Sequence, residues 1–160
     1  MPYKSMVVNL FNIKTFDNTT FCLRGEVWVK GIDHIGIAVN SIDNALPLYT
    51  NIFQMSHVKT EMVESQKVKV AFINANNTKI ELLEPISEDS TIQKFLNKKG
   101  EGIHHIAFKT EDIYGELENL ERTGVQLIDK EPRIGAGGAL VAFIHPKGTF
   151  GVLYELCQKQ

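Results

Sequence analysis

The tetrapeptide Val70-Ala71-Phe72-Ile73 recurs letter for letter as Val141-Ala142-Phe143-Ile144. A His stands 36 residues ahead of each copy, His34 before the first and His105 before the second, so the motif and the His repeat with the same 71-residue spacing. A chain that repeats its polar residues together with its apolar pattern is typical of a duplicated unit. We therefore predict two equivalent halves that build one shared site.

Each copy of the motif is followed by a carboxylate inside a further apolar run. Glu81 lies in the run 78–83 and Glu155 in the run 152–156. The two are 74 residues apart, so the second half carries a three-residue insertion between motif and carboxylate. A buried carboxylate is costly unless it is paired or coordinated. The two His and two Glu therefore indicate a metal site.

Side chains alternate between the two faces of a strand, so residues two apart share a face. His34 shares its face with Gly36, and His105 shares its face with Ala107. We expect His104 on the opposite face, in helix packing or at the surface. The remaining candidates are interpreted as solvent-facing or loop residues: His57, His145, Glu61, Glu64 and Glu84.

The composition of the 160 residues is that of an ordinary globular domain, with 43% hydrophobic and 22% charged residues. A net charge of −2 and a pI near 6.2 do not suit nucleic acid or a membrane surface, so we expect small-molecule partners. Two cysteines are too few for a disulfide framework, which favours a cytoplasmic location. The sequence shows neither a membrane-spanning run nor a signal peptide.

The repeat divides the chain into an N-terminal arm or hairpin, residues 1–29, and a domain, residues 30–157. The domain consists of repeats 30–85 and 101–157, and each repeat is predicted to be βαβββ. The expected strands are 32–39, 58–63, 67–74, 78–84, 103–109, 126–130, 138–145 and 151–157.

Three helices are expected from apolar spacing and end signals. Ser41 is the predicted N-cap of the first helix, whose apolar positions are Ile42, Ala45, Leu46, Tyr49 and Phe53 and which Pro47 should kink. A linker helix should run over 90–98 and end at Gly100. Asp112 or Thr110 should cap the third helix, with Gly124 after its end; its predicted buried side chains are Ile113, Leu117 and Leu120.

Several separate motifs resemble those of methylmalonyl-CoA epimerases. They are the runs 32–39, 79–85 and 102–107, and the C-terminal run that begins Glu131-Pro132-Arg133-Ile134-Gly135-Ala136-Gly137-Gly138 and continues through 141–147 and 151–156. The resemblance covers about residues 30–157 and places the chain beside glyoxalase I, extradiol dioxygenases and bleomycin-resistance proteins in the vicinal oxygen chelate superfamily. It implies an α+β glyoxalase-like fold, in which two tandem βαβββ modules form a curved mixed sheet around a metal site.

The resemblance also implies the roles of particular residues. The metal ligands fall on His34, His105 and Glu155, with Glu81 at the fourth equivalent position. Such imidazole and carboxylate ligands suit Co²⁺, Mn²⁺, Ni²⁺ or Zn²⁺. Some members of the family carry a base on the strand that here includes 66–70, but this stretch contains no acid. We therefore predict Glu81 and Glu155 as the catalytic bases.

The expected reaction is removal of the proton beside a thioester carbonyl, which interconverts (R)- and (S)-methylmalonyl-CoA. A divalent ion would stabilise the enolate that forms. The expected substrate contacts are Gly137 and Gly138, whose lack of a side chain permits close approach, and Lys147 near the cofactor's phosphates. The expected partner is an acyl-CoA thioester, and the expected assembly is a homodimer.

Three other members of the superfamily offer alternative functions. Glyoxalase I uses the same two-His, two-Glu cup on a glutathione hemithioacetal. A metal-free binding protein of the bleomycin-resistance type is disfavoured because all four ligand positions are present. A dioxygenase is disfavoured because Glu81 would occupy the position that a two-His, one-carboxylate iron site leaves open.

Overall fold

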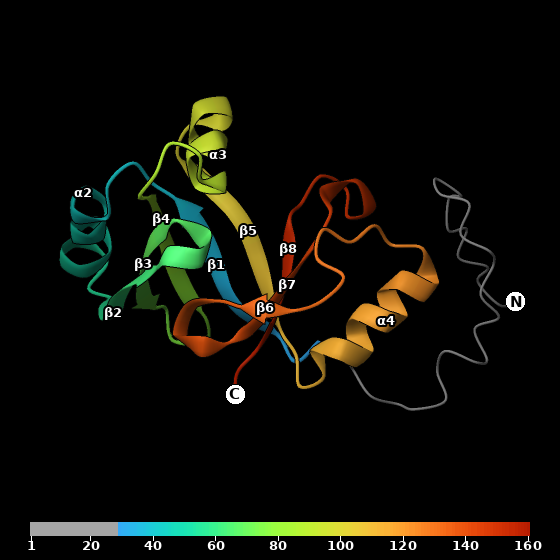
Figure 1. Cartoon of the computed structure of the whole chain (residues 1–160). Helices are drawn as coiled ribbons and strands as arrows, with labels where there is room; N and C mark the ends of the chain where they lie inside the picture. The colour runs from blue at the N-terminus through green and yellow to red at the C-terminus, as the bar shows by residue number, and fades with distance from the viewer. Residues whose placement is uncertain (1–28) are drawn as a thin grey trace, which may run out of the picture.

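A computed structural model describes residues 29–160, so the predicted arm, apart from Val29, lies outside the described residues (Figure 1). Eight strands form one sheet: β1 Ile32–Ala38, β2 Ser56–Val63, β3 Val68–Asn74, β4 Lys79–Pro85, β5 Gly102–Lys109, β6 Arg133–Ile134, β7 Leu140–Ile144 and β8 Tyr154–Gln158. The α-helices are α2 Ile42–Pro47, α3 Thr91–Lys99 and α4 Ile113–Thr123. None of these described helices is long and apolar enough to cross a membrane.

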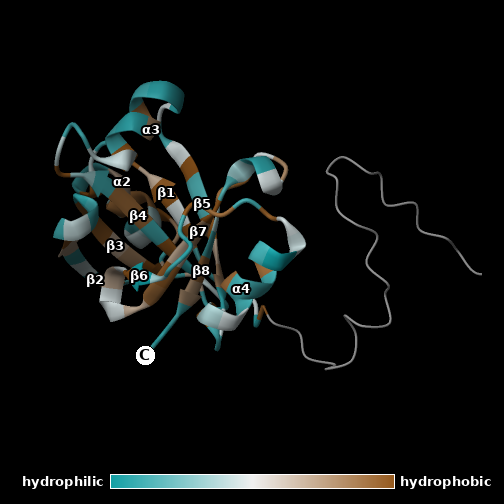
Figure 2. Cartoon of the chain, turned by 45° about the vertical axis from the view of Figure 1, so that its right-hand side comes forward, coloured by the Kyte–Doolittle hydropathy of each residue, from teal (hydrophilic) through white to brown (hydrophobic). Residues whose placement is uncertain are grey.

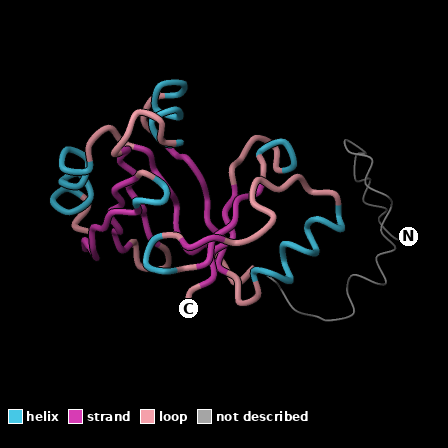
Figure 3. The backbone as a smooth tube through the Cα atoms, viewed as in Figure 1, coloured by secondary structure: helices cyan, strands magenta, loops and turns pink. Residues whose placement is uncertain are grey.

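The strand order is β2-β3-β4-β1-β5-β8-β7-β6, which reads the same outward from the centre in both halves. The β1–β4 and β5–β8 pairs are parallel, whereas the central β1–β5 pair and the outer pairs are antiparallel. The mixed sheet curls (Figure 3), with α2 and α4 packed on its outer face, whereas α3 packs against the inner-face residues Val70 and Phe72. The predicted α+β fold of two βαβββ modules around a curved sheet is confirmed.

The repeated tetrapeptide is buried on both of its faces, which explains why all four of its residues are apolar. In β3, Ala71 and Ile73 belong to the core beneath α2, and Ala142 and Ile144 of β7 belong to the equivalent core beneath α4. The alternate Val and Phe residues of each copy line the inner face of the curve. Figure 2 shows these strands as mainly hydrophobic and the helices with large hydrophilic parts.

The first helix begins as predicted and changes type at the proline. The Ser41 Oγ accepts a hydrogen bond from the Asn44 N–H at 3.3 Å. Pro47 has no N–H to donate within the helix, and a π-helical turn, Leu48–Ile52, follows it. The wider turn changes the phase of the side chains, so Phe53 is 56% exposed instead of lying on the predicted apolar face.

The other two helices have the predicted ends. The Ser90 hydroxyl caps α3, which ends at Gly100. Asp112, rather than the alternative Thr110, caps α4 by accepting a hydrogen bond from the Gly115 N–H at 3.0 Å. Gly124 follows α4 with a φ of 80°, a left-handed conformation that favours glycine. Of the three predicted inward residues of α4, Ile113 and Leu117 are fully buried and Leu120 packs against the same core while partly exposed.

The predicted strand at 126–130 is wrong. Only an isolated bridge joins Leu127 to Ile144, and the next regular strand is the short β6. The reason is a local hydrogen-bond pattern in which the Ile128 and Asp129 N–H groups both donate to the Phe143 carbonyl. The Asp129 carboxylate also accepts the Phe143 N–H at 2.9 Å, so a side chain replaces the main-chain acceptor that a regular ladder would need.

Candidate metal centre and active site

The inner face of the curved sheet encloses a cavity of about 390 Å³ that both halves of the chain line. Its apolar wall includes Val70 and Phe72 of β3 and their counterparts Val141 and Phe143 of β7. The four predicted ligands His34, Glu81, His105 and Glu155 also line it, and each is at most 5% exposed. The structure thus brings these four residues into one buried place.

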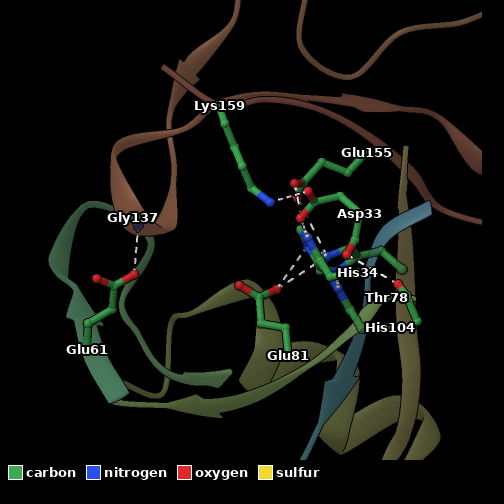
Figure 4. A network of polar contacts seen from close by, with 10 residues as sticks. Asp33, His34, Glu61, Thr78, Glu81, His104, Gly137, Glu155 and Lys159 are labelled. Atoms are coloured by element: carbon green, nitrogen blue, oxygen red, sulfur yellow. Dashed lines mark hydrogen bonds and ion pairs between the residues drawn. The ribbon is translucent and has the colours of Figure 1, made fainter. Parts of the chain in front are cut away.

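The side-chain tips of these four residues converge, and Figure 4 labels three of them, His34, Glu81 and Glu155. The Nε2 atoms of His34 and His105 are 3.1 Å apart. Glu81 Oε2 lies 3.3 Å from the Nε2 of His34 and 3.5 Å from that of His105. The Glu155 carboxylate reaches both ring nitrogens at 3.6 Å. Each carboxylate therefore contacts both imidazoles.

Equivalent strand registers place these side chains in the two halves. Glu81 of β4 pairs with Phe72 of β3, and Glu155 of β8 pairs with Phe143 of β7. The ring of Phe72 meets that of His34 edge-on at a centroid distance of 6.2 Å, and Phe143 meets His105 in the same way at 5.4 Å. The repeated Phe therefore supports the His of its own half from beside the Glu.

The His105 ring occupies the space in front of Gly36. A Cβ at position 36 would lie 2.2 Å from the His105 Cε1, far inside van der Waals contact. Gly36 is the residue of β1 that pairs with His105 of β5 across the centre of the sheet. A glycine is therefore required here because an imidazole approaches its backbone closely.

Burial and close ion pairs shift the pKa values of the residues of the centre in opposite directions. Burial lowers the pKa of His34, but contacts with Asp33, Glu81 and Glu155 outweigh it and raise this pKa to about 10. Burial raises the pKa of Glu81, but the two imidazoles outweigh it and lower this pKa to about 2. Burial dominates at Glu155 and raises its pKa.

Two β-bulges at equivalent positions of β1 and β5 explain why strand alternation does not predict the orientations of Asp33 and His104. Asp33 in β1 and His104 in β5 are the residues skipped in the β1–β5 register, and they are related by the 71-residue spacing. A bulge reorients its extra residue. Both side chains line the cavity, so the prediction that His104 faces away from it is wrong, although its ring does pack on Phe95 of α3 at 5.0 Å.

Asp33 and His104 contact the two His ligands at their Nδ1 atoms. The Asp33 Oδ1 lies 3.1 Å from the His34 Nδ1, and the His104 and His105 Nδ1 atoms are 2.9 Å apart. The contacts of Asp33 with His34 and Lys159 lower its pKa although burial opposes this, so it is a carboxylate. Burial lowers the pKa of His104 to about 4. A carboxylate beside the second nitrogen fixes the tautomer and orientation of a ligating His.

Replacing Asp33 with Asn is expected to weaken divalent-metal affinity by about 10- to 100-fold, because the His34 ring loses its anionic partner. Titration with Co²⁺, followed by the absorption of the bound ion, measures the change. The exposed Asp43→Asn is a matched control that should leave the affinity within about twofold. Equal affinities for wild type and Asp33→Asn would show that the contact does not position His34.

Metal affinity is expected to rise with pH. In protein from which metal has been removed, the raised pKa of His34 keeps its ring protonated at pH 7, and an ion must displace that proton to bind Nε2. Loss of one proton makes the affinity rise about tenfold per pH unit below pH 10. Calorimetry between pH 6.5 and 8.5, in buffers of different ionisation enthalpy, should show release of at least one proton. Affinity independent of pH would contradict this.

A hydrogen bond joins the two halves of the chain beside the cavity. The Glu61 carboxylate of β2 accepts a hydrogen bond from the Gly137 N–H at 2.7 Å, so the interpretation of Glu61 as simply solvent-facing is wrong (Figure 4). Glu84 is likewise engaged, because it accepts the Ile42 N–H at 2.6 Å. Glu64 and His57 are exposed, as expected.

Of the three expected substrate contacts, one lines the cavity and two do not. Gly137 lines the cavity, whereas Gly138 and Lys147 are exposed and do not belong to its lining. The loop 135–139 precedes β7 and the turn Pro146–Gly148 follows it, so Lys147 lies at the opposite end of that strand. The cations that do line the cavity are Lys59, Lys79, Arg133 and Lys159.

The residues present fit a divalent metal ion. Donor atoms of His34, His105 and Glu155 lie within 4.8 Å of one another, and Glu81 lies beside both imidazoles. Two imidazoles and two carboxylates are the donor set of ordinary transition-metal sites, and the ion would offset the cost of burying two carboxylates. Asp33, His34 and Cys157 are also close, but burial raises the pKa of the Cys157 thiol to about 12, which disfavours a thiolate ligand.

Fold and site together define a glyoxalase-like cup whose buried residues fit a metal ion. The family model described as Glyoxalase/Bleomycin resistance protein/Dioxygenase superfamily matches residues 33–143. The chain belongs to this superfamily.

Of three similar proteins, two have names that state an activity. The chain is 50% identical over 127 residues to the protein YqjC of Bacillus subtilis, covering 79% of this chain and 91% of that one. It is 40% identical to an ethylmalonyl-CoA/methylmalonyl-CoA epimerase of Cereibacter sphaeroides, covering 79% of this chain and 96% of that one. A structure of Streptomyces coelicolor methylmalonyl-CoA epimerase in complex with 2-nitronate-propionyl-CoA matches with a TM-score of 0.78 and 37% identity, covering 82% and 98% of the two chains.

Proposed function

We propose that the chain is a methylmalonyl-CoA epimerase that moves the proton on the carbon between the thioester and the free carboxylate. The observation that carries this proposal is a pair of buried carboxylates, Glu81 and Glu155, that face one cavity from opposite halves of the sheet. An epimerase needs a base on one side of the carbon and a proton donor on the other. The similarity to proteins named as epimerases of this substrate supports it.

The residues of the cavity wall limit the choice of bases. Among the described residues that line the cavity, the carboxylates are Asp33, Glu81 and Glu155. Asp33 is engaged with His34 and Lys159. In the stretch 66–70, which includes the start of β3, the residues that line the cavity are Gln66, Val68 and Val70, so this stretch supplies no acid. We therefore assign proton removal and return to Glu81 and Glu155.

The other residues of the centre have supporting roles in this proposal. His34, His105, Glu155 and Glu81 would hold a divalent ion, for which Co²⁺, Mn²⁺, Ni²⁺ and Zn²⁺ are the candidates. Such an ion supplies stabilisation of the negative charge that develops on the thioester oxygen. Whichever carboxylate removes the proton must be free to leave its imidazole partners, since an ion pair lowers its basicity. Phe72 and Phe143 exclude water from the reacting carbon.

Turnover of a coenzyme A thioester and of a glutathione hemithioacetal, measured side by side, tests the proposal. Metal-reconstituted protein should exchange the α-proton of methylmalonyl-CoA with solvent deuterium and racemise a single epimer, as followed by NMR and chiral analysis. Glyoxalase I is the alternative and is not favoured, because the relatives at 37–40% identity are named as epimerases. Turnover of the methylglyoxal–glutathione hemithioacetal without any exchange in methylmalonyl-CoA would select glyoxalase instead. The homodimer and the cytoplasmic location stay predictions from the sequence.

A further inference from the structure

Two lysines enter the same cavity from neighbouring parts of the two halves. Lys79 begins β4 two residues before Glu81, and Lys159 follows the end of β8 four residues after Glu155. Strand alternation places Lys79 on the face of Glu81 and Lys159 on the face of Glu155. Both lysines line the cavity together with the two carboxylates.

Lys159 is paired with a carboxylate of the described residues, whereas Lys79 is not. Lys159 Nζ contacts the Asp33 Oδ2, as Figure 4 shows, and Lys79 Nζ lies 5.9 Å from the centre of the Phe72 ring. Within residues 29–160, Lys79 forms no ion pair. The other two cations of the wall have their own partners, because Lys59 pairs with Glu61 and Arg133 with Asp129. Among the described residues, Lys79 therefore adds to this wall a positive charge that has no ion-pair partner, beside the paired Lys159.

The position of this positive charge suits one group of the proposed substrate. Asp33 contacts Lys159 through one oxygen and His34 through the other. The Asp33 carboxylate therefore connects the Lys159 ammonium to His34 of the catalytic centre. His34 also pairs with Lys79 across the β1–β4 register. The free carboxylate of a malonyl thioester is bonded to the reacting carbon, so it must lie just beside Glu81 and Glu155. Without a cation, these buried carboxylates would repel it.

We propose that Lys79 and Lys159 bind the free carboxylate of the substrate and make the site selective for 2-carboxyacyl thioesters. This inference rests on the proposed function. With the carboxylate held at the lysines and the thioester held at the other end of the cavity, two of the four substituents of the reacting carbon are fixed. The two epimers then differ in the side on which the hydrogen lies, relative to the plane through the reacting carbon and its two fixed substituents. The hydrogen of one epimer points toward Glu81, and that of the other epimer points toward Glu155.

Affinities of two coenzyme A thioesters test the inference without requiring turnover. Calorimetry on metal-reconstituted protein compares methylmalonyl-CoA with propionyl-CoA, which lacks only the carboxylate. The double variant Lys79→Gln/Lys159→Gln should bind methylmalonyl-CoA about 10- to 100-fold more weakly, the range of a lost charge-assisted hydrogen bond. Its affinity for propionyl-CoA should stay within about twofold. Gln at position 159 keeps a donor for Asp33.

Controls separate a local charge effect from damage and from binding of the nucleotide. Lys98→Gln removes a charge at the exposed end of α3 and should change neither affinity. Equal metal content and melting temperature show that the double variant is intact. Methylmalonyl-pantetheine, which lacks the nucleotide phosphates of coenzyme A, should show the same dependence on the two lysines.

Two outcomes would overturn the inference. Equal weakening of both coenzyme A thioesters, with no effect on the pantetheine thioester, would assign the lysines to the nucleotide phosphates. Unchanged affinity for methylmalonyl-CoA in an intact double variant would leave them without a role in binding. Failure of the proposed function looks different: the wild-type protein would bind methylmalonyl-CoA through the lysines but exchange no α-proton.

Discussion

Replacing Glu81 or Glu155 with Gln is expected to slow racemisation of methylmalonyl-CoA by about 10²- to 10⁴-fold, together with solvent-deuterium exchange of the epimer that the replaced carboxylate deprotonates. A Gln side chain keeps the shape of the carboxylate but cannot accept a proton in this reaction. Each carboxylate serves one epimer as base, so each variant should retain part of the exchange of one epimer while losing racemisation. NMR with separated (R)- and (S)-thioesters measures both rates.

Metal content must be measured alongside, because both carboxylates also contact the two imidazoles. His34→Ala provides the comparison: its loss of activity should come mainly from loss of the ion, and excess Co²⁺ should partly restore it. The Gln variants should not recover in this way once they are saturated with metal. Full exchange in both Gln variants with metal bound would show that neither carboxylate is the base.

Replacing Gly36 with Ala is expected to reduce metal affinity and epimerase activity by at least about 100-fold, because the new Cβ displaces a ligand. The space for that Cβ is filled by the His105 ring, whose Cε1 would be 2.2 Å away. The ring is the end of a side chain, so it can turn aside, and the fold should lose little stability. Titration with Co²⁺ and the melting temperature together distinguish displacement of the ring from unfolding.

A double-mutant cycle tests whether the effect passes through His105. His105→Ala alone should lose metal affinity, and adding Gly36→Ala should then cost almost nothing further, because the ring that the methyl group would strike is absent. Additive losses in the double variant would mean that Gly36 acts through the backbone of β1 instead. Wild-type affinity in the single variant would show that the close approach of His105 is unnecessary.

The sequence alone was sufficient for the duplicated architecture and for the four residues that converge in the cup. The reason is that the repeat carries its polar residues along with its apolar ones: His34 and His105 recur with the motif copies that contain Phe72 and Phe143. Helix ends at Ser90, Asp112 and Gly124 were also predictable, because capping depends on a few neighbouring residues.

Only the tertiary structure determined which polar residues surround the four residues that converge in the cup. Alternation predicted His104 away from the cup and did not indicate Asp33, because a β-bulge reverses the face of one residue and its position depends on the partner strand. The contact of Glu61 with Gly137 joins residues 76 apart in the sequence. Lys159 reaches Asp33 across an even longer separation, and no local pattern in either segment reveals the other. Long-range packing therefore determined the polar surroundings of the centre, whereas the internal repeat of the sequence identified its ligands.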